Sequence, residues 1–274
     1  MGEILSVQHL AFSYAAAKTI QKQVLNDINF ELDKKEVICL MGANGCGKTT
    51  LLDCILGEHD NYSGTILLDQ TDIRERSPKE TAQYISYIPQ LHDRKFPFSV
   101  KEIVSMGSLA HKTMFEKIED EDYKKAEQAL KELGIAHLSD TPYTQISGGE
   151  LQLTLLARSL VQDTEIILMD EPSAHLDFKN EMIFMHGVIK LIKQKGASAL
   201  IATHSPNQAF YFELSGINCK VCLMNNGEIV SSGLPSEVLT PQNLREVFDI
   251  DAIILSGEKS NKHARVIAPL FTKS

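Results

Sequence analysis

One eight-residue stretch, Gly42–Thr49, constrains the fold of this chain more than any other feature. Its letters, GANGCGKT, match the pattern G-x-x-x-x-G-K-[S/T] without a gap. The apolar run Val37–Met41 before it is typical of a buried strand, and Thr50–Leu56 after it is typical of a helix. In such a strand–loop–helix unit, the loop amides wrap phosphate groups and the start of the helix favours negative charge. The sequence therefore predicts an α/β core that binds a nucleoside triphosphate.

The residues of this loop have separate expected roles. The ammonium group of Lys48 is expected to reach the β- and γ-phosphates, and the hydroxyl of Thr49 is expected to hold Mg²⁺. The loop and the first helical turn supply the predicted nucleotide contacts, which are Asn44, Gly45, Cys46, Gly47, Lys48, Thr49 and Thr50. An ordinary glycine-rich turn is the alternative interpretation, and the strand and helix flanks disfavour it.

Charge and hydropathy exclude several classes of protein. The formal charge of the 274-residue chain is −9, whereas a nucleic-acid surface needs clustered Lys and Arg. No apolar run approaches the ~18–20 residues that span a bilayer, and Glu3 lies where a secretory signal would carry positive charge. We therefore expect a cytosolic protein that does not bind nucleic acid.

Two local patterns have competing interpretations. Cys219 and Cys222 form a lone C-x-x-C, but a strand turns positions i and i+3 to opposite faces, which disfavours a metal or redox site. An odd total of five cysteines also suggests no disulfide framework. The start, Met1–Ser6, matches the myristoylation pattern M-G-x-x-x-[S/T]. Its simpler interpretation is a first edge strand over Glu3–Leu10.

The pattern of elements predicts an α/β core interrupted by a helical insertion. Predicted strands cover Ile4–Leu10, Val24–Leu32, Thr65–Leu68, Tyr84–Ile88, Glu165–Met169 and Ser198–Ala202. Helical periodicity runs from Ser99 to Val161 and again over Lys179–Lys195. We expect a core of residues 1–90 and 163–235, a helical insertion of residues 91–162, and a tail of residues 236–274. The tail is expected to hold one short helix and a strand near Arg265–Ile267.

Polar side chains follow two of the buried strands. Asp170 and Glu171 end one of them, at the sheet edge where parallel strands place their ligands. Asp170 is expected to hold Mg²⁺ and Glu171 to polarise the attacking water, whereas a plain polar turn is the alternative. His204 ends the next strand, where it either donates a hydrogen bond to the γ-phosphate or acts only as a polar cap.

The tetrapeptide Ser147–Glu150 reads as a capping box at the start of a helix. A capping box explains Ser147 and Glu150, but not two glycines in the first turn, each of which costs up to about 1 kcal/mol. Close approach of an anion to the helix start explains them. Because the tetrapeptide is remote in sequence from Gly42–Thr49, we infer a second nucleotide contact, and another subunit is one way to supply it.

Together these residues resemble the ATP-binding-cassette ATPase family over nearly the whole chain. Gly42–Thr49 resembles Walker A, and Ile166–Glu171 resembles Walker B with its catalytic glutamate. The other motifs are the Q-loop Gln90, the signature Ile146–Glu150, the D-loop Ala174–Asp177, the H-loop His204 and the adenine-stacking aromatic Tyr14. Three departures are Ile146 in place of Leu, Glu150 in place of Gln, and Leu151 and Leu153 where many members have Arg. The stretch after His204 is also longer than usual.

The resemblance implies a fold and a mechanism. The fold is an α/β P-loop NTPase core (RecA-like) with an antiparallel β subdomain and an inserted α-helical subdomain. Thr49, Gln90 and Asp170 would hold Mg²⁺, with Lys48, Gln90, Glu171 and His204 as the catalytic set. Two chains would sandwich two ATP molecules head to tail. Ser147 and Gly149 of one chain would then face the γ-phosphate held by Lys48 of the other. The predicted nucleotide contacts also include Gly148, Glu150 and Asp177.

Three segments resemble one branch of importers, which takes up iron-siderophore, haem and cobalamin chelates. They are Ser99–Gly107, Ala174–Phe178 and Leu239–Phe248, although this branch often has Gly-Arg where Gly107-Ser108 stands. The resemblance implies separate membrane permease subunits, a substrate-binding protein, and a place at the cytoplasmic face of the membrane. It also implies that a coupling helix is received between Gln90 and Gly149, a segment that includes Phe96–Val100. Alternatives are a zinc or manganese transporter, a soluble cassette protein acting on ribosomes or DNA, and an ATP-binding scaffold without turnover. The presence of Glu171 and His204 disfavours the last.

Overall fold

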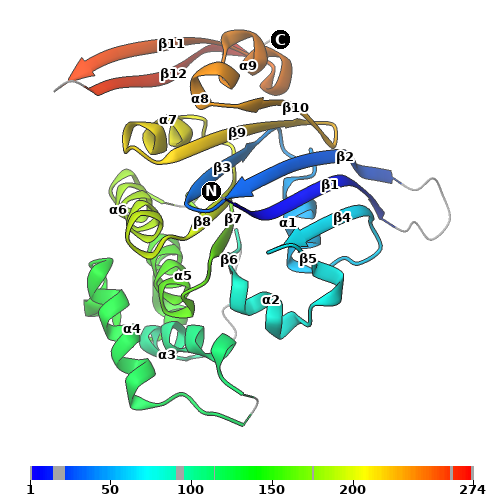
Figure 1. Ribbon diagram of the computed structural model, residues 1–274. Helices are drawn as coiled ribbons and strands as arrows, with labels where there is room; N and C mark the ends of the chain where they lie inside the picture. Colours follow the sequence, from blue (N-terminus) through cyan, green and yellow to red (C-terminus); the bar gives the residue numbers. More distant parts are fainter. Residues whose placement is uncertain are drawn as a thin grey trace. The chain divides into compact units, whose positions relative to one another are not determined.

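The computed structural model describes residues 2–14, 22–90, 96–113, 115–174, 176–259 and 262–272 (Figure 1). The chain divides into two units. The first consists of residues 1–76 and 198–274, and the second of residues 77–197. Each unit has its own buried apolar side chains, so we describe each by itself.

The first unit begins with an antiparallel sheet in the order β2-β1-β4-β5. Its strands are β1 (Glu3–Tyr14), β2 (Lys22–Asp33), β4 (Ser63–Leu68) and β5 (Thr71–Asp72). Strand β1 pairs with both β2 and β4, so it is an inner strand and the prediction of an edge strand over Glu3–Leu10 was wrong. Apolar alternation along a strand reports which face is buried, but it does not report how many neighbours the strand has.

The parallel strands of the first unit carry the ends at which ligands are expected. The order is β10-β9-β3-β8, with β3 (Glu36–Met41), β8 (Ser198–Thr203), β9 (Asn218–Asn225) and β10 (Glu228–Gly233). Strand β3 runs parallel to both β8 and β9, whereas β10 is antiparallel to β9. Every residue of β3 and β8 is buried, which is why Val37–Met41 and Ala199–Ala202 within them are continuous apolar runs. Helices α1 (Lys48–Leu56) and α7 (Asn207–Leu214) follow β3 and β8 along the chain.

The C-terminal part of the first unit holds more elements than predicted. Two short helices, α8 (Pro235–Val238) and α9 (Pro241–Phe248), each start with a proline, which suits the first helical position. Strands β11 (Ile250–Lys259) and β12 (Lys262–Thr272) then form a separate antiparallel hairpin (Figure 1). The prediction of one helix and one strand was therefore wrong. The hairpin buries few side chains, among them Ala252 and Ile267, so its apolar signal is weak.

The second unit is mainly helical. Its elements are α2 (Pro78–Tyr84), β6 (Ile85–Ile88), α3 (Val100–Ser105), α4 (Asp120–Glu132), α5 (Gly148–Gln162), β7 (Ile166–Asp170) and α6 (Phe178–Lys190), with β6 parallel to β7. A π-helical turn, Leu191–Lys195, completes the segment that was predicted as one helix. Gly187 lets α6 pack closely, because a Cβ there would lie 2.7 Å from Leu156 Cδ2 and 2.8 Å from Leu133 Cδ2.

In the ranges that the structure describes, no helix is both long enough and apolar enough to cross a bilayer. The result agrees with the hydropathy of the sequence.

Candidate nucleotide site

The phosphate loop of the first unit has the backbone that its glycines predict. Gly45 and Gly47 have φ angles of 79° and 110°, in the left-handed region that favours glycine. A Cβ on Gly47 would also lie 2.9 Å from Leu25 Cδ2 and 3.0 Å from the Val24 carbonyl oxygen, so strand β2 closes this side of the loop. Gly47 is the N-cap of α1 and has no side chain to cap the N–H groups of the first turn. The helix start is therefore suited to an anion.

Lys48 lies over the loop that precedes it. Its Nζ donates to the carbonyl oxygens of Gly42 at 2.8 Å and Ala43 at 3.3 Å, and the residue is 6% exposed. Asn44, Gly45 and Thr49 are exposed, whereas Cys46 and Thr50 are buried. Burial raises the pKa of the Cys46 thiol. The loop thus presents backbone and ammonium donors, which fit a phosphate chain.

Tyr14 ends strand β1 and is joined to the helix that follows the loop. Its hydroxyl lies 3.2 Å from Thr50 Oγ1, and 45% of the residue is exposed. The structure therefore brings the predicted adenine-stacking residue to the first turn of α1. The exposed part of the side chain is the part that a base can contact.

The carboxylates of the second unit follow β7. Asp170 is buried, at 3% exposed, and Glu171 follows it with φ 43°, an uncommon backbone conformation for a residue with a Cβ. Gln90 follows the neighbouring strand β6, and its Nε2 donates to Glu171 Oε2 at 2.9 Å. The structure thus places two predicted catalytic residues in direct contact. The side-chain oxygens of Asp170 and Gln90 are ligands of the kind that Mg²⁺ prefers.

His204 follows β8 in the first unit and is exposed. Two hydrogen bonds define the turn that carries it. The Ser205 N–H donates to Thr203 Oγ1, and the Thr203 hydroxyl donates to Gln208 Oε1, both at 3.0 Å. The imidazole is therefore presented at the end of a rigid strand.

The predicted capping box at the start of α5 is present. Ser147 Oγ accepts from the Glu150 N–H at 3.3 Å, and the Ser147 N–H donates to Glu150 Oε2 at 2.8 Å. These bonds lower the pKa of Glu150, with the backbone N–H of Ser147 as the largest cause. Ser147 is exposed at the helix start, and its hydroxyl also donates to Glu150 Oε2 at 2.7 Å.

The structure supplies a packing reason for one of the two signature glycines. A Cβ on Gly149 would lie 3.0 Å from Asn180 Nδ2, and Gly149 is buried against the start of α6. Gly149 thus has a packing reason of its own, and the anion contact inferred from the sequence stays a prediction. Asp177 caps α6, because its Oδ1 accepts from the Asn180 N–H at 2.7 Å. His175 of the same predicted D-loop lies outside the described residues.

The unusual leucines of the signature helix have a structural reason. Leu151 and Leu153 are 6% and 1% exposed, on a helix whose apolar residues are mostly buried in the second unit. Where many family members have arginine, these two leucines belong to the apolar core. Burial of their apolar surface stabilises the unit.

Cys219 and Cys222 do not form a common site. Cys219 Sγ lies 3.9 Å from Cys39 Sγ, whereas Cys222 Sγ lies 3.5 Å from Ser232 Oγ. Burial raises the pKa of Cys222 to about 11. Within the described residues, no group of three or more His, Cys, Asp or Glu side chains is arranged to hold a metal ion.

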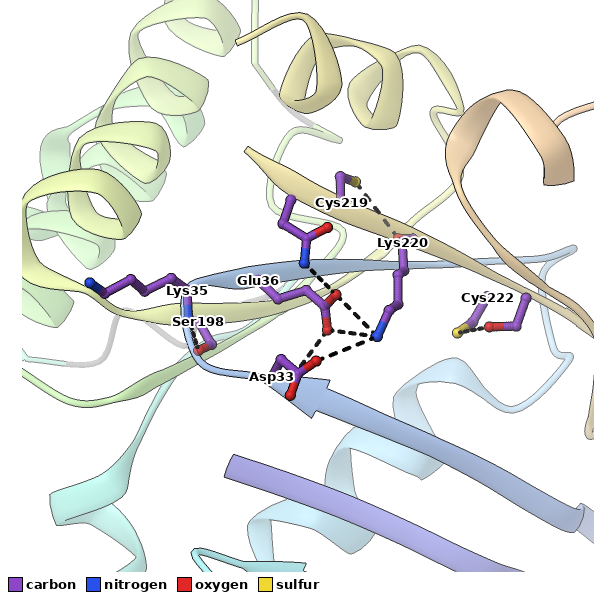
Figure 2. Close-up of polar contacts among 9 residues, drawn as sticks. Asp33, Lys35, Glu36, Ser198, Cys219, Lys220 and Cys222 are labelled. Atoms are coloured by element: carbon purple, nitrogen blue, oxygen red, sulfur yellow. Dashed lines mark hydrogen bonds and ion pairs between the residues drawn. The ribbon is translucent and has the colours of Figure 1, made fainter. Parts of the chain in front are cut away.

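A buried carboxylate that sequence reasoning missed lies at the start of β3. Glu36 is 0% exposed and accepts from the Asp33 N–H at 3.0 Å, Asn218 Nδ2 at 2.9 Å and Lys220 Nζ at 3.1 Å. Figure 2 shows Glu36 and Lys220 pointing toward each other from the neighbouring strands β3 and β9. Through Glu36, the cluster links the β2–β3 turn to strand β9. Glu36 begins β3, the strand that leads to the phosphate loop. An acidic residue directly before a fully apolar run was its only signal.

The comparison with family models matches residues 25–174 to the ABC transporter model. The match includes the phosphate loop, Gln90, the signature and the Walker B carboxylates. It covers more than half of the chain.

Curated relatives and solved structures match nearly the whole chain. The molybdate import ATP-binding protein MolC of Haemophilus influenzae is 35% identical over 271 residues, covering 99% of this chain and 98% of its own length. The iron(3+)-hydroxamate import ATP-binding protein FhuC of Bacillus subtilis is 31% identical, covering 94% of this chain and 92% of its own length. A solved inward-facing ABC transporter assigned to the metal-chelate type is 32% identical, with a TM-score of 0.81, covering 99% of this chain and 98% of that one. The predicted mixed α/β cassette fold is confirmed.

Proposed function

Because the chain belongs to the ABC transporter family and is an ATPase of that family, we propose that it is the ATP-hydrolysing subunit of a metal-chelate importer. The observation that carries the proposal is the phosphate loop, with its left-handed glycines, its bare helix start and Lys48 lying over it. The import ATP-binding proteins among its relatives support the proposal that separate permease subunits and a substrate-binding protein work with this chain. In this proposal the chain lies at the cytoplasmic face of a membrane.

Each residue of the candidate nucleotide site has its own proposed role in ATP hydrolysis. Lys48 and the loop amides hold the β- and γ-phosphates and stabilise the charge that develops on them. Thr49, Asp170 and Gln90 hold Mg²⁺, which neutralises charge on the phosphates. Glu171 polarises the attacking water, and His204 donates to the γ-phosphate. Gln90 Nε2 donates to Glu171 Oε2, and this bond helps to orient the carboxylate.

We propose that each site is completed by a second copy of the chain. Ser147 is exposed at the start of α5. The start of this helix suits an anion, but the phosphate loop belongs to the other unit. In a head-to-tail dimer, this helix start faces the γ-phosphate held by Lys48 of the other copy. Hydrolysis then requires closure of the dimer.

Mixing two inactive variants tests the shared site. Lys48→Ala removes the phosphate contact, and Ser147→Arg removes the signature hydroxyl; each homodimer is expected to be inactive. Mixed dimers contain one site with both lesions and one site with neither, so ATPase activity should return to about half of the wild-type value in those dimers. The control pair is Lys48→Ala with Glu171→Gln, in which each site keeps one lesion. If that control recovers equally, or the first pair does not recover, the head-to-tail site is wrong.

Aromatic side chains of the second unit offer a surface to the permease. Phe96 and Phe98 are 65% and 40% exposed, with ring centroids 6.1 Å apart, and Leu109 is also exposed. Such exposed large apolar side chains mark interaction sites. Phe96 and Phe98 follow Gln90 in the sequence, so we propose that a permease helix bound to them acts near the catalytic glutamine.

The double variant Phe96→Ala/Phe98→Ala is expected to lose co-purification with the permease and to abolish transport. Its ATPase rate without the permease should remain within about twofold of wild type, because surface substitutions usually have small effects. Phe271→Ala is the matched control, since Phe271 is 75% exposed on the hairpin of the other unit. Retained co-purification of the double variant would contradict the assigned surface.

A molybdate importer subunit among the relatives supports an oxyanion as the second candidate substrate. The chelate or oxyanion contacts the permease and the binding protein, so the test uses the assembled transporter. Ferric hydroxamate and molybdate are each added to the transporter with its binding protein, and ATPase stimulation is measured. Stimulation by the ferric hydroxamate alone supports metal-chelate import, and stimulation by molybdate alone contradicts it.

A further inference from the structure

Three aromatic rings meet beside the phosphate-loop helix. The Phe12 and His59 rings are stacked, with centroids 4.7 Å apart and an interplanar angle of 15°. The Tyr14 ring stands at right angles to both, 4.9 Å from Phe12 and 5.5 Å from His59. Phe12 is buried at 3% exposed, whereas Tyr14 is 45% exposed. The cluster therefore has a fixed inner part and an accessible outer part.

His59 is placed by the helix that begins at the phosphate loop. Helix α1 ends at Gly57, whose N–H donates to the Cys54 carbonyl oxygen at 3.1 Å and whose φ is 78°. The Glu58 N–H then donates to the Asp53 carbonyl oxygen at 3.0 Å. This cap turns the chain back and brings His59 to the Phe12 ring. Tyr14 thus contacts two residues that α1 positions. Thr50 lies in the first turn of the helix, and His59 follows its C-terminal cap.

We propose that His59 is a positioning residue for nucleotide binding, which holds the Tyr14 ring in the orientation that receives the adenine base. This inference rests on the proposed role of Tyr14. The Tyr14 hydroxyl lies 3.2 Å from Thr50 Oγ1, and a ring held through its hydroxyl still rotates about its long axis. Contact with the perpendicular His59 and Phe12 rings removes that freedom, so less entropy is lost when a base stacks.

The proposal separates base binding from phosphate binding. Lys48 and the loop amides contact phosphates, so loss of His59 should weaken ATP while leaving inorganic tripolyphosphate unaffected. An aromatic pair contributes enough to predict an affinity change of about two- to tenfold. The KM for ATP should rise by the same factor with kcat unchanged, because Glu171 and His204 are untouched.

The experiment measures the dissociation constants of ATP and tripolyphosphate by calorimetry on the full chain. His59→Ala should raise the constant for ATP only, and His59→Phe should restore it because a phenyl ring keeps both ring contacts. His59→Gln, similar in size but not aromatic, should behave as His59→Ala. His9→Ala is the matched control: His9 lies on the same strand as Tyr14 and contacts Asp27 through its Nδ1.

Equal weakening of ATP and tripolyphosphate by His59→Ala would overturn the proposal, and so would failure of His59→Phe to restore binding. Tyr14→Ala identifies which assumption is wrong. If Tyr14→Ala weakens ATP selectively and His59→Ala does not, the role of His59 is refuted while base stacking by Tyr14 stands. If Tyr14→Ala leaves both constants unchanged, base stacking is refuted and the role of His59 with it. Neither result would change the proposed roles of the phosphate loop and the carboxylates in ATP hydrolysis.

Discussion

Replacement of Glu171 by glutamine is expected to lower kcat for ATP hydrolysis by about 10²–10⁴-fold, the usual contribution of a general base. Gln keeps the size of the side chain and one oxygen, but it does not accept the proton of the attacking water. Glu171 also has a left-handed backbone conformation at φ 43°, which glutamine and glutamate adopt at similar cost. The loss should therefore come from chemistry and not from misfolding.

The measurement pairs steady-state hydrolysis with ATP binding and gel filtration. ATP affinity should be kept, and the ATP-bound dimer should persist because it no longer hydrolyses its nucleotide. Glu165→Gln, just before β7, is the control and should keep normal turnover. Normal hydrolysis by Glu171→Gln without a longer-lived dimer would show that another residue is the base.

Glu36→Ala should destabilise the chain by about 3 kcal/mol, because it breaks a buried, hydrogen-bonded ion pair. It leaves the Asp33 N–H and the Asn218 amide without their buried acceptor, and it removes the carboxylate from Lys220. The Lys220 side chain is 36% exposed, so water recovers part of the charge interaction and limits the loss.

Urea unfolding of the full chain checks this value, with fluorescence and far-UV circular dichroism compared because two units need not unfold together. Glu36→Gln keeps an oxygen acceptor for Asn218 and should lose roughly half as much stability. A change below about 0.5 kcal/mol for Glu36→Ala would mean that the cluster contributes little to stability.

The sequence predicts the local backbone of the candidate nucleotide site correctly, because the signals for it are local. Gly42–Thr49 and the capping box at Ser147 each depend on residues within one turn of the chain, and both have the expected backbone. The carboxylates at the end of β7 follow from one apolar run and the residues after it. Local patterns therefore identify a site whose parts lie on different elements.

Features that depend on distant neighbours were missed. The inner position of β1 is set by pairing with β4, about sixty residues away in sequence. The contact of His59 with Phe12 and the contact of Glu36 with Lys220 likewise join segments that share no motif. For Gly149, the sequence suggested an anion contact. It did not reveal the packing against Asn180, because Asn180 follows thirty-one positions later.

All five cysteines are buried, so the rate at which a thiol reagent labels each of them reports how often that part of the chain opens. Thiol reagents attack the thiolate, and burial disfavours that form at Cys46, Cys54 and Cys222. Alkylation of the native protein is therefore limited by how often each thiol becomes accessible. Cys46 lies in the phosphate loop itself, so bound nucleotide should slow its labelling more than that of the strand cysteines. The labelling rate of one natural side chain thus separates local movement of the loop from unfolding of the core.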